Sequence, residues 1–440
     1  MSNATDVTSA APVAESERIE TLDVIRGFAL LGILLMNIVG MGMLSAAYSH
    51  PLVGAGGAPA TALDLQVWFL AELFGEGAMR ALFSMLFGAG VVLFATGARA
   101  KSAALHYKRT FWLLIFGIVD AFVLLWSGDI LMVYAMCGAV LYGVPNASSA
   151  RLFTVATVLL TLMCSFHWSI EYAFEDSRAA AELAVIEKNG GSDSAETSAL
   201  AQRASTWLDF KADATPSPER IEAELSQRQG SYLSAFTWNR QEVIELLVFA
   251  VPTVLFWDAL TMMLFGMALY KIGVLPGARA KPFYRNLMLA GLGFGIAINY
   301  WETSNIQALE YDTIATFGFS HFTYDLGRMG LALGYIGLLG WVVANGWLPA
   351  ARRRLAAVGR MALTNYLMHS LIALILFTGA GFALVGELQR WQLYPIVFAV
   401  WGFQLWFSPW WLLRHSMGPL EALWRRLTYG AKRSDSAFEA

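Results

Sequence analysis

The chain has 440 residues, of which 57% are hydrophobic and only 14% are charged, and its formal net charge is −3. Soluble domains carry about one quarter charged residues. The low charge, the mean hydropathy of +0.52 and the repeated apolar runs of about twenty residues exclude a soluble globular domain and indicate a polytopic membrane protein.

The apolar runs predict an all-α fold, a transmembrane helix bundle of about ten spans. Residues 1–17 are polar and acidic without a basic stretch, so we expect a disordered cytoplasmic tail rather than a cleaved signal. The further divisions are membrane helices 1–5 in 18–170, a polar insertion in 171–240, membrane helices 6–10 in 241–430 and a cytoplasmic tail in 431–440. The spans are expected at about 24–46, 79–98, 110–128, 130–146, 151–170, 244–272, 286–303, 324–344, 361–382 and 391–413.

Basic residues set the expected orientation. They gather in three short connections, 99–109, 271–285 and 352–360, and in the C-terminal tail. The positive-inside rule then places both termini in the cytoplasm of a bacterial-type inner membrane and the polar insertion outside. The insertion is expected to form helices around 177–189, 196–208 and 218–229, with a stop at Gly190 and a start at Ser217 before Pro218. It is either a cap over an extracytoplasmic cleft or a solvated spacer.

The first span, LDVIRGFALLGILLMN, carries polar residues on one stripe. Arg26 and Asn37 are eleven residues apart, so they share a helix face and are separated by about 16 Å along the axis. Asp23 lies one turn before Arg26 and can neutralise it. The stripe either serves a function or has a structural role. In the structural case, Asp23 and Arg26 anchor the helix at the membrane surface and the Asn37 amide packs against a neighbouring helix. The next apolar stretch, 63–77, contains Glu72 and Glu76, and we expect it to form a half-helix or re-entrant element.

Several ionisable residues fall inside the apolar runs, where they are costly and are functional candidates by default. Asp120 and Asp258 are mid-span carboxylates, and Arg80 and Arg328 are the cations most readily drawn inward. They predict a charged, water-accessible cavity, to which we also assign Tyr134 and Asn365. Asp129 follows a Gly and precedes a span, so it either joins the cavity or caps the next helix.

The histidines divide by position. We expect His106 and His415 to be solvated in cytoplasmic loops and His369 to be a hydrogen-bonded packing residue. His50, His167 and His321 are expected near the outer surface, where one of them could be a catalytic base. No helical metal-ligand spacing links the histidines, and Cys137 and Cys164 lie in apolar runs, so no metal site is expected.

Six stretches resemble the YeiB-like membrane family, domain-of-unknown-function family 418, in order along the chain: RIETLDVIRGFALLGILLMNI, RALFSMLFGAGVVL, WSGDILMVYAMCG, LFGMALYKIG, GRMALTNYLMHS and GPLEALWRRLTYG. The resemblance implies a multi-pass inner-membrane protein. The first span is also similar to the opening helix of two groups of membrane acyltransferases. The acyltransferase-type-3 group has a histidine at the position of Asn37, whereas the heparan-glucosaminide acetyltransferase group has Asn there and a catalytic histidine in the next outer loop.

This chain departs from those patterns in two places. His50 occurs at a comparable distance after Asn37, but the H-x-x-W-x-G setting of the acetyltransferase group is absent. The YeiB-like family usually has a histidine where this chain has Asp120. A carboxylate base would therefore replace a histidine, or that role would be lost.

Two functions are compatible with these residues, and an assembly or scaffold role is a third alternative. A transmembrane acyltransferase would bind a cytoplasmic acyl-coenzyme A or similar thioester, with no resident cofactor, through Arg26, Arg360 and Arg425. Asn37 would orient the thioester, and Asp120 or His50 would deprotonate an outer small-molecule, glycan or lipid acceptor. A transporter would instead bind a proton or polar solute at Asp120, Asp258 and Arg328. The bilayer is the expected environment, a homodimer is compatible with the sequence, and nucleic acid is not an expected partner.

Overall fold

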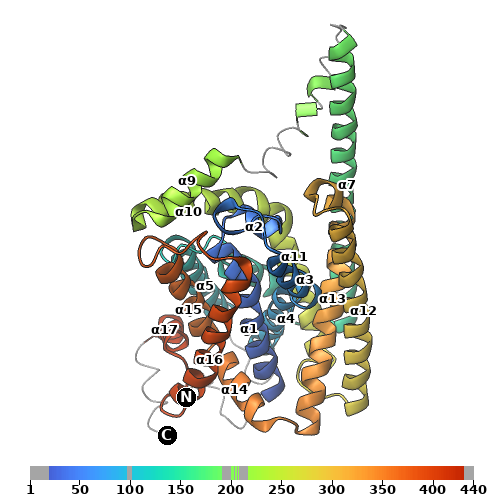
Figure 1. Ribbon diagram of the computed structural model, residues 1–440. Helices are drawn as coiled ribbons and strands as arrows, with labels where there is room; N and C mark the ends of the chain where they lie inside the picture. Colours follow the sequence, from blue (N-terminus) through green and yellow to red (C-terminus); the bar gives the residue numbers. More distant parts are fainter. Residues whose placement is uncertain are drawn as a thin grey trace, which may run out of the picture.

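A computed structural model describes residues 19–96, 102–190 and 217–430, with a few positions between 200 and 207. The described chain is helical apart from a single bridge between Val53 and Pro59. The helices stand side by side in a bundle, and α7 projects far beyond one end of it (Figure 1). The expected tails at 1–17 and 431–440, and most of the expected helix at 196–208, lie outside the described residues.

The first half of the chain supplies α1 to α7. Their bounds are α1 Glu20–Gly42, α2 Ala46–Ser49, η2 Ala55–Gly57, α3 Ala62–Phe74, α4 Ala78–Ala95, α5 Ala103–Phe122, α6 Leu131–Leu141 and α7 Ser149–Gly190. The second half supplies α9 Pro218–Gln229, α10 Tyr232–Glu245, η3 Leu246–Leu255, α11 Phe256–Lys271, α12 Lys281–Ala308, α13 Thr313–Asn345, α14 Pro349–Arg360, α15 Ala362–Phe377, α16 Arg390–Leu412 and α17 Pro419–Tyr429.

The centre of the bundle is built from α1, α4, α11 and α13, whose inward side chains are fully buried. The backbones of α4 and α11 approach closely because a glycine lies at each side of the crossing. A Cβ on Gly88 would lie 2.0 Å from the Met263 carbonyl oxygen, and one on Gly266 would lie 1.9 Å from that of Met85. Such close contact is typical of helices that associate within a bilayer.

Five segments are long and apolar enough to cross a membrane. They are Glu20–Gly42, Ala62–Ala95, Ser149–Phe166, Tyr232–Lys271 and Thr323–Asn345, and the pair α14 and α15, bent by 79° at its junction, adds a sixth if it counts as one span. Helices α5, α12 and α16, of 20, 28 and 23 residues, stand alongside them in the bundle (Figure 1). The described chain therefore has the character of a membrane protein, and the count of about ten spans stays a prediction.

Two expected helix boundaries are absent. We expected the fifth span to end near residue 170 and a separate helix to begin near 177, but α7 is continuous from Ser149 to Gly190. No Gly or Pro interrupts 149–189, so the fall in hydrophobicity after residue 170 changes the environment without breaking the helix. Likewise, α10 continues through η3 into α11 across the expected boundary at residue 240, and a π-helical segment accommodates Pro252.

Other expected local features are present. Ser217 caps the N-terminus of α9, and its side chain accepts a hydrogen bond from the Arg220 backbone N–H. The stretch expected as a half-helix forms α3, which is separated from α4 by a break at Gly75–Gly77 where Gly77 has a φ of +66°.

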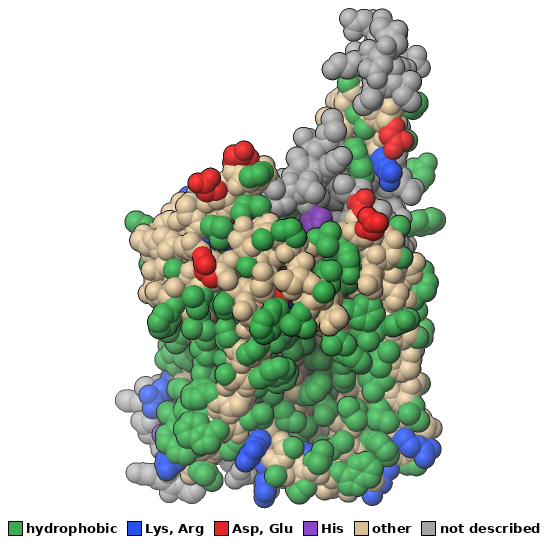
Figure 2. Space-filling view, viewed as in Figure 1, with side chains coloured by type: hydrophobic (Ala, Val, Ile, Leu, Met, Phe, Trp, Pro, Cys, Tyr) green, Lys and Arg blue, Asp and Glu red, His purple; other side chains and the backbone are tan. Residues whose placement is uncertain are grey.

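The two ends of the bundle differ in charge. Lys and Arg side chains gather near the lower edge and Asp and Glu near the upper edge, with a hydrophobic band between them (Figure 2). Below, "the basic end" is the end that holds α14 and α17, and "the acidic end" is the end that holds α2, α9 and α10 (Figure 1). Such an asymmetry is the kind that the positive-inside rule describes, and the orientation of the basic end toward the cytoplasm stays a prediction.

Candidate active site

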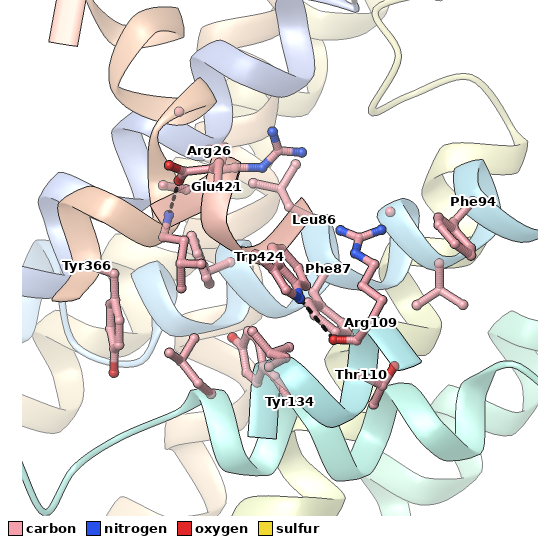
Figure 3. A pocket seen from close by; sticks show the side chains of 18 of the residues that line it. Arg26, Leu86, Phe87, Phe94, Arg109, Thr110, Tyr134, Tyr366, Glu421 and Trp424 are labelled. Atoms are coloured by element: carbon pink, nitrogen blue, oxygen red, sulfur yellow. Dashed lines mark hydrogen bonds between the residues drawn. The ribbon is translucent and has the colours of Figure 1, made fainter. Parts of the chain in front are cut away.

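A cavity of about 280 Å³ opens near the basic end, between α1, α4, α5, α6, α15 and α17. Three guanidinium-bearing residues line it: Arg26, Arg109 and Arg360. Apolar and aromatic side chains form most of the remaining wall, among them Phe87 and Trp424 (Figure 3). A pocket with cationic groups and an apolar wall suits a ligand that joins an anionic head to an apolar or weakly polar arm.

Each arginine is held by a different element. Arg26 of α1 forms an ion pair with Asp23 at 2.8 Å. The Arg109 guanidinium of α5 lies 4.5 Å from the centre of the Trp424 ring, and the Trp424 indole N–H donates to the Arg109 carbonyl at 2.9 Å (Figure 3). Arg360, the last residue of α14, donates to the Ser416 carbonyl at 3.4 Å. All three side chains are half-buried, so contact with a ligand remains open to them.

The carboxylate of Glu421 attaches α17 to the cavity rim. It accepts hydrogen bonds from the Leu363 and Thr364 backbone N–H groups at 2.7 and 3.1 Å, and from the Thr364 hydroxyl at 2.6 Å. These N–H groups belong to the first turn of α15, which has no partners for them within its own helix. Burial raises the pKa of the Glu421 carboxyl above its ordinary value, and the hydrogen bonds oppose that shift. Glu421 thus caps α15 from a neighbouring helix.

The deep end of the cavity is formed by Leu131 and by two tyrosines, Tyr134 and Tyr366. The Tyr134 hydroxyl is hydrogen-bonded to that of Ser84 at 2.6 Å and lies 3.4 Å from the Arg80 carbonyl oxygen. The Tyr366 hydroxyl accepts a hydrogen bond from the Ile130 N–H at 3.2 Å. Because the hydroxyl accepts this bond, its own proton is directed elsewhere, and the Asp129 carboxyl is the adjacent acceptor.

Behind Tyr366 lie two buried carboxyl groups, those of Asp120 and Asp129, which are 0% and 6% exposed. They interact with each other, and Tyr366 is adjacent to both. Asp129 accepts from the Met132 N–H at 2.9 Å and so caps α6, as one of the two sequence-based alternatives predicts. Within the described chain, neither carboxylate oxygen of Asp120 forms a well-aligned hydrogen bond, and its polar neighbours are Asp129 and the Ser370 hydroxyl. Below, these two groups are called the carboxyl pair.

A second, smaller cavity of about 50 Å³ lies near the acidic end. Trp126, in the loop between α5 and α6, belongs to its wall, together with Arg228 of α9 and Glu242 of α10. Trp126 is also adjacent to Tyr366. Tyr366, which lines the cavity at the basic end and is adjacent to the carboxyl pair, is therefore also a neighbour of the cavity at the acidic end through Trp126.

A separate ionic network joins α4, α11 and α13. Asp258 forms ion pairs with Arg328 at 2.5 Å and with Arg80 at 3.3 Å, and Arg328 also pairs with Asp325. The sequence predicts that Asp258, Arg80 and Arg328 share a site, and the structure brings them together. Asp325 was missed, although its spacing of three residues from Arg328 in one helix is a signal for such a pair.

The remaining predicted site residues are scattered. Asn37 is half-buried on the face of α1 that carries Arg26, but Leu30 and Ile33, 0% and 5% exposed, close the stripe between them. The Asn365 amide donates to the Val358 carbonyl and to Ser408, away from the ionic network. His50 ends α2 at the acidic end.

Arg425 does not line the cavity, contrary to expectation, and its guanidinium instead lies over the Tyr429 ring. Arg109 takes the third cationic position. The sequence places Arg109 in a basic loop, whereas α5 already begins at Ala103 and turns this side chain inward.

The expectation for His106 is wrong. It is 4% exposed, its Nε2 is 2.8 Å from the Gly138 carbonyl oxygen, and it belongs to the cavity wall. The cause is again the early start of α5, which directs His106 against α6. The expectation for His369 is confirmed, because it is buried and hydrogen-bonded to Gln404. The side chains of His167 and His321 lie outside the described residues.

Comparison with known proteins places this architecture in a family. The family model described as "Protein of unknown function (DUF418)" matches residues 269–431. The chain is 30% identical to the uncharacterized protein YeiB of Escherichia coli strain K12, over 94% of this chain and 97% of that protein. It is 27% identical to the uncharacterized protein YxaH of Bacillus subtilis strain 168, over 96% of this chain and 97% of that protein. No solved structure matches. With a family-model match across its C-terminal helices and a relative aligned along nearly its whole length, the chain belongs to the YeiB-like DUF418 family.

Proposed function

We propose that this protein is a transmembrane acyltransferase that takes an acyl group from a cytoplasmic thioester and passes it to an acceptor at the carboxyl pair. The observation that carries the proposal is the cavity at the basic end. Three guanidinium groups line it, and one of its lining residues, Tyr366, is also adjacent to two buried carboxyl groups, those of Asp120 and Asp129.

The cavity suits the donor in size and charge. At about 280 Å³ it is near the lower limit for ligand pockets, so it accommodates the arm of an acyl thioester such as acyl-coenzyme A rather than the whole molecule. The nucleotide would remain at the basic end. Its phosphates would be met there by Arg26, Arg109 and Arg360, whose planar guanidiniums bind phosphate oxygens in pairs.

The deep end supplies groups for acyl transfer. The acceptor's nucleophilic atom attacks the thioester carbonyl carbon, a new bond forms to that carbon, and the C–S bond breaks to release the thiol. Asp120, which forms no well-aligned hydrogen bond within the described chain, is the better placed base, and His50 lies at the acidic end outside both cavities. The Tyr366 hydroxyl would donate to the developing oxyanion instead of to Asp129. Asn37 would reach the oxyanion only if the side chain of Leu30 or Ile33 moved out of the way.

Transport is the second candidate, and it too rests on a specific observation. One cavity lies near each end of the bundle, and residues adjacent to the carboxyl pair or to its neighbour Tyr366 line both of them, an arrangement compatible with alternating access to a central site. In that case the carboxyl pair would carry a proton or a polar solute, with the same expected orientation in a bacterial inner membrane.

Comparing the products of three strains tests the proposal. One strain carries the wild-type gene, one lacks the gene and one carries the Asp120→Asn variant. Lipids, envelope glycans and small metabolites are compared by mass spectrometry. We expect a species heavier by one acyl group in the wild type alone. Equal acylation in all three strains, together with Asp120-dependent solute flux in vesicles, would favour transport instead.

A further inference from the structure

We infer that the carboxyl pair binds a primary ammonium group, which becomes the nucleophilic amine of the acceptor once Asp120 has accepted one of its protons. The role of this group as an acyl acceptor rests on the proposed function, whereas the binding of an ammonium group does not. The inference is drawn from the hydrogen-bonding atoms left unused around the pair, from its charge, and from the cavity beside it.

The unused atoms call for a ligand rich in hydrogen-bond donors. Within the described chain, five buried atoms around Tyr366 form no well-aligned hydrogen bond and have mainly one another as polar neighbours: Asp120 Oδ1 and Oδ2, Asp129 Oδ1, Ser370 Oγ and Trp126 Nε1. Asp120 is adjacent to Ser370, and Trp126 is adjacent to Tyr366, so these atoms belong to one cluster. Three of the five are carboxyl oxygens. Buried polar groups are nearly always paired, so a cluster of this kind indicates that a water, an ion or a ligand binds there.

The charge of the pair selects among donor-rich ligands. Two adjacent carboxyl groups cannot both ionise in a buried site unless a cation accompanies them. The ion pairs that described residues form include neither Asp120 nor Asp129. Asp258, in contrast, is held by two guanidiniums. An ammonium group brings one positive charge and three N–H donors, which matches both deficits at once.

The acidic-end cavity offers an approach for such a group. Its volume of about 50 Å³ fits a few waters or the end of an aminoalkyl chain, and Trp126 separates it from the pair. The titratable group adjacent to the pair is Tyr366 of α15, while Glu242 of α10 and Arg228 of α9 are charged groups in the wall of this cavity. In the absence of ligand the pair retains one proton. Ammonium binding therefore displaces a proton into solvent.

Calorimetric titration of the purified protein in lipid nanodiscs tests the inference. The probes are ethanolamine hydrochloride, ethylene glycol as a neutral analogue of similar size, and tetramethylammonium as a cation without N–H donors. We expect ethanolamine alone to bind measurably, with proton release detected as a dependence of the heat on the ionisation enthalpy of the buffer. The Asp120→Asn variant should bind at least tenfold more weakly, and Asp312→Asn, which alters an exposed carboxylate, should bind as the wild type does.

Equal binding of ethanolamine and ethylene glycol, or unchanged ethanolamine binding in Asp120→Asn, would overturn the inference. If Asp120→Asn does not fold, Ser370→Ala provides the same test, because it removes only one hydroxyl and should weaken ethanolamine severalfold. Coenzyme A is titrated separately. If ethanolamine binds and coenzyme A does not, the acyltransferase proposal is contradicted and the ammonium site is supported. If coenzyme A binds and ethanolamine does not, the ammonium site is contradicted and the acyltransferase proposal is supported.

Discussion

Asp120 and Asp258 are both buried carboxylates within apolar helices, yet their surroundings are opposite. Asp258 is compensated by Arg80 of α4 and Arg328 of α13, whereas no ion pair between described residues includes Asp120. Sequence analysis treats them alike, because it identifies buried charge from hydrophobic context. Their difference depends on residues about 70 to 180 positions away in sequence, and no local pattern predicts such contacts. A residue left unpaired at a cost in stability is a stronger candidate for function than one that is fully compensated.

This difference predicts opposite effects on stability. Asp120→Asn should raise the thermal unfolding midpoint, since it removes an uncompensated carboxyl group whose burial costs about 1–3 kcal/mol, and should abolish transfer. Asp258→Asn should lower the midpoint, because it breaks a buried ion-pair network at a cost of about 3–5 kcal/mol. Thermal unfolding in detergent, with expression level as the control, measures both. A fall of similar size in the two variants would show that Asp120 is compensated in a way that this account does not include.

The tyrosine between the cavity and the carboxyl pair provides a second residue-scale prediction. Tyr366→Phe keeps the aromatic wall and removes only the hydroxyl, so coenzyme A should bind with unchanged affinity while transfer slows by roughly 10²–10³-fold, as when an oxyanion donor is lost. Asn37→Ala should slow transfer less, because Leu30 and Ile33 separate Asn37 from the cavity. Steady-state rates and binding titrations on both variants provide the comparison. A larger loss of transfer for Asn37→Ala would return the oxyanion role to Asn37.

At the scale of elements, the sequence predicts helices better than it predicts where they end or turn. The start of α9 at Ser217–Pro218 follows from capping chemistry and is present. The early start of α5 at Ala103 was missed, and with it the inward positions of His106 and Arg109. Basic residues near a membrane surface belong equally to loops and to helix ends, and charge alone does not separate the two. The site residues that the sequence misplaces are therefore those whose direction, inward or outward, depends on where a helix begins.

The docking of α17 yields a prediction for an element. Glu421→Ala removes three hydrogen bonds to the first turn of α15 and should destabilise the docked helix by about 1–3 kcal/mol, which exposes the cavity rim. Limited proteolysis should then cut near α17 faster than in the wild type, and coenzyme A affinity should fall. Arg425→Ala on the same helix is the matched control, because this side chain contacts Tyr429 rather than α15. Equal proteolysis of the two variants would mean that apolar packing, not the cap, holds α17.

At the scale of the whole molecule, composition and charge were the most informative features of the sequence. They predict a helical membrane protein with a basic end and a polar extension, and these are present in the described chain. The number of spans could not be obtained in the same way. Helices such as α5 and α12 carry charged residues and rank low in hydropathy, although they stand in the bundle beside the apolar ones (Figure 1).

Orientation is the prediction that belongs to this scale. Single cysteines are introduced at Arg354 on α14 and at Glu222 on α9, both exposed, in a background without Cys137 and Cys164. A membrane-impermeant thiol reagent applied to intact cells should label position 222 and leave position 354 unlabelled until the cells are lysed. Labelling of 354 but not of 222 would invert the orientation, and the basic-end cavity would then face away from the cytoplasmic donor.

The central claim is that the basic-end cavity binds an acyl thioester carrier, and titration of coenzyme A into the protein in nanodiscs tests it most directly. We expect the wild type to bind. Arg26→Lys and Arg109→Lys should each weaken binding roughly tenfold, or about 1.4 kcal/mol, because lysine keeps the charge but loses the paired N–H donors. Arg425→Lys, outside the cavity, should bind as the wild type does. Absence of binding to the wild type at millimolar coenzyme A, or equal weakening by all three substitutions, would contradict the account.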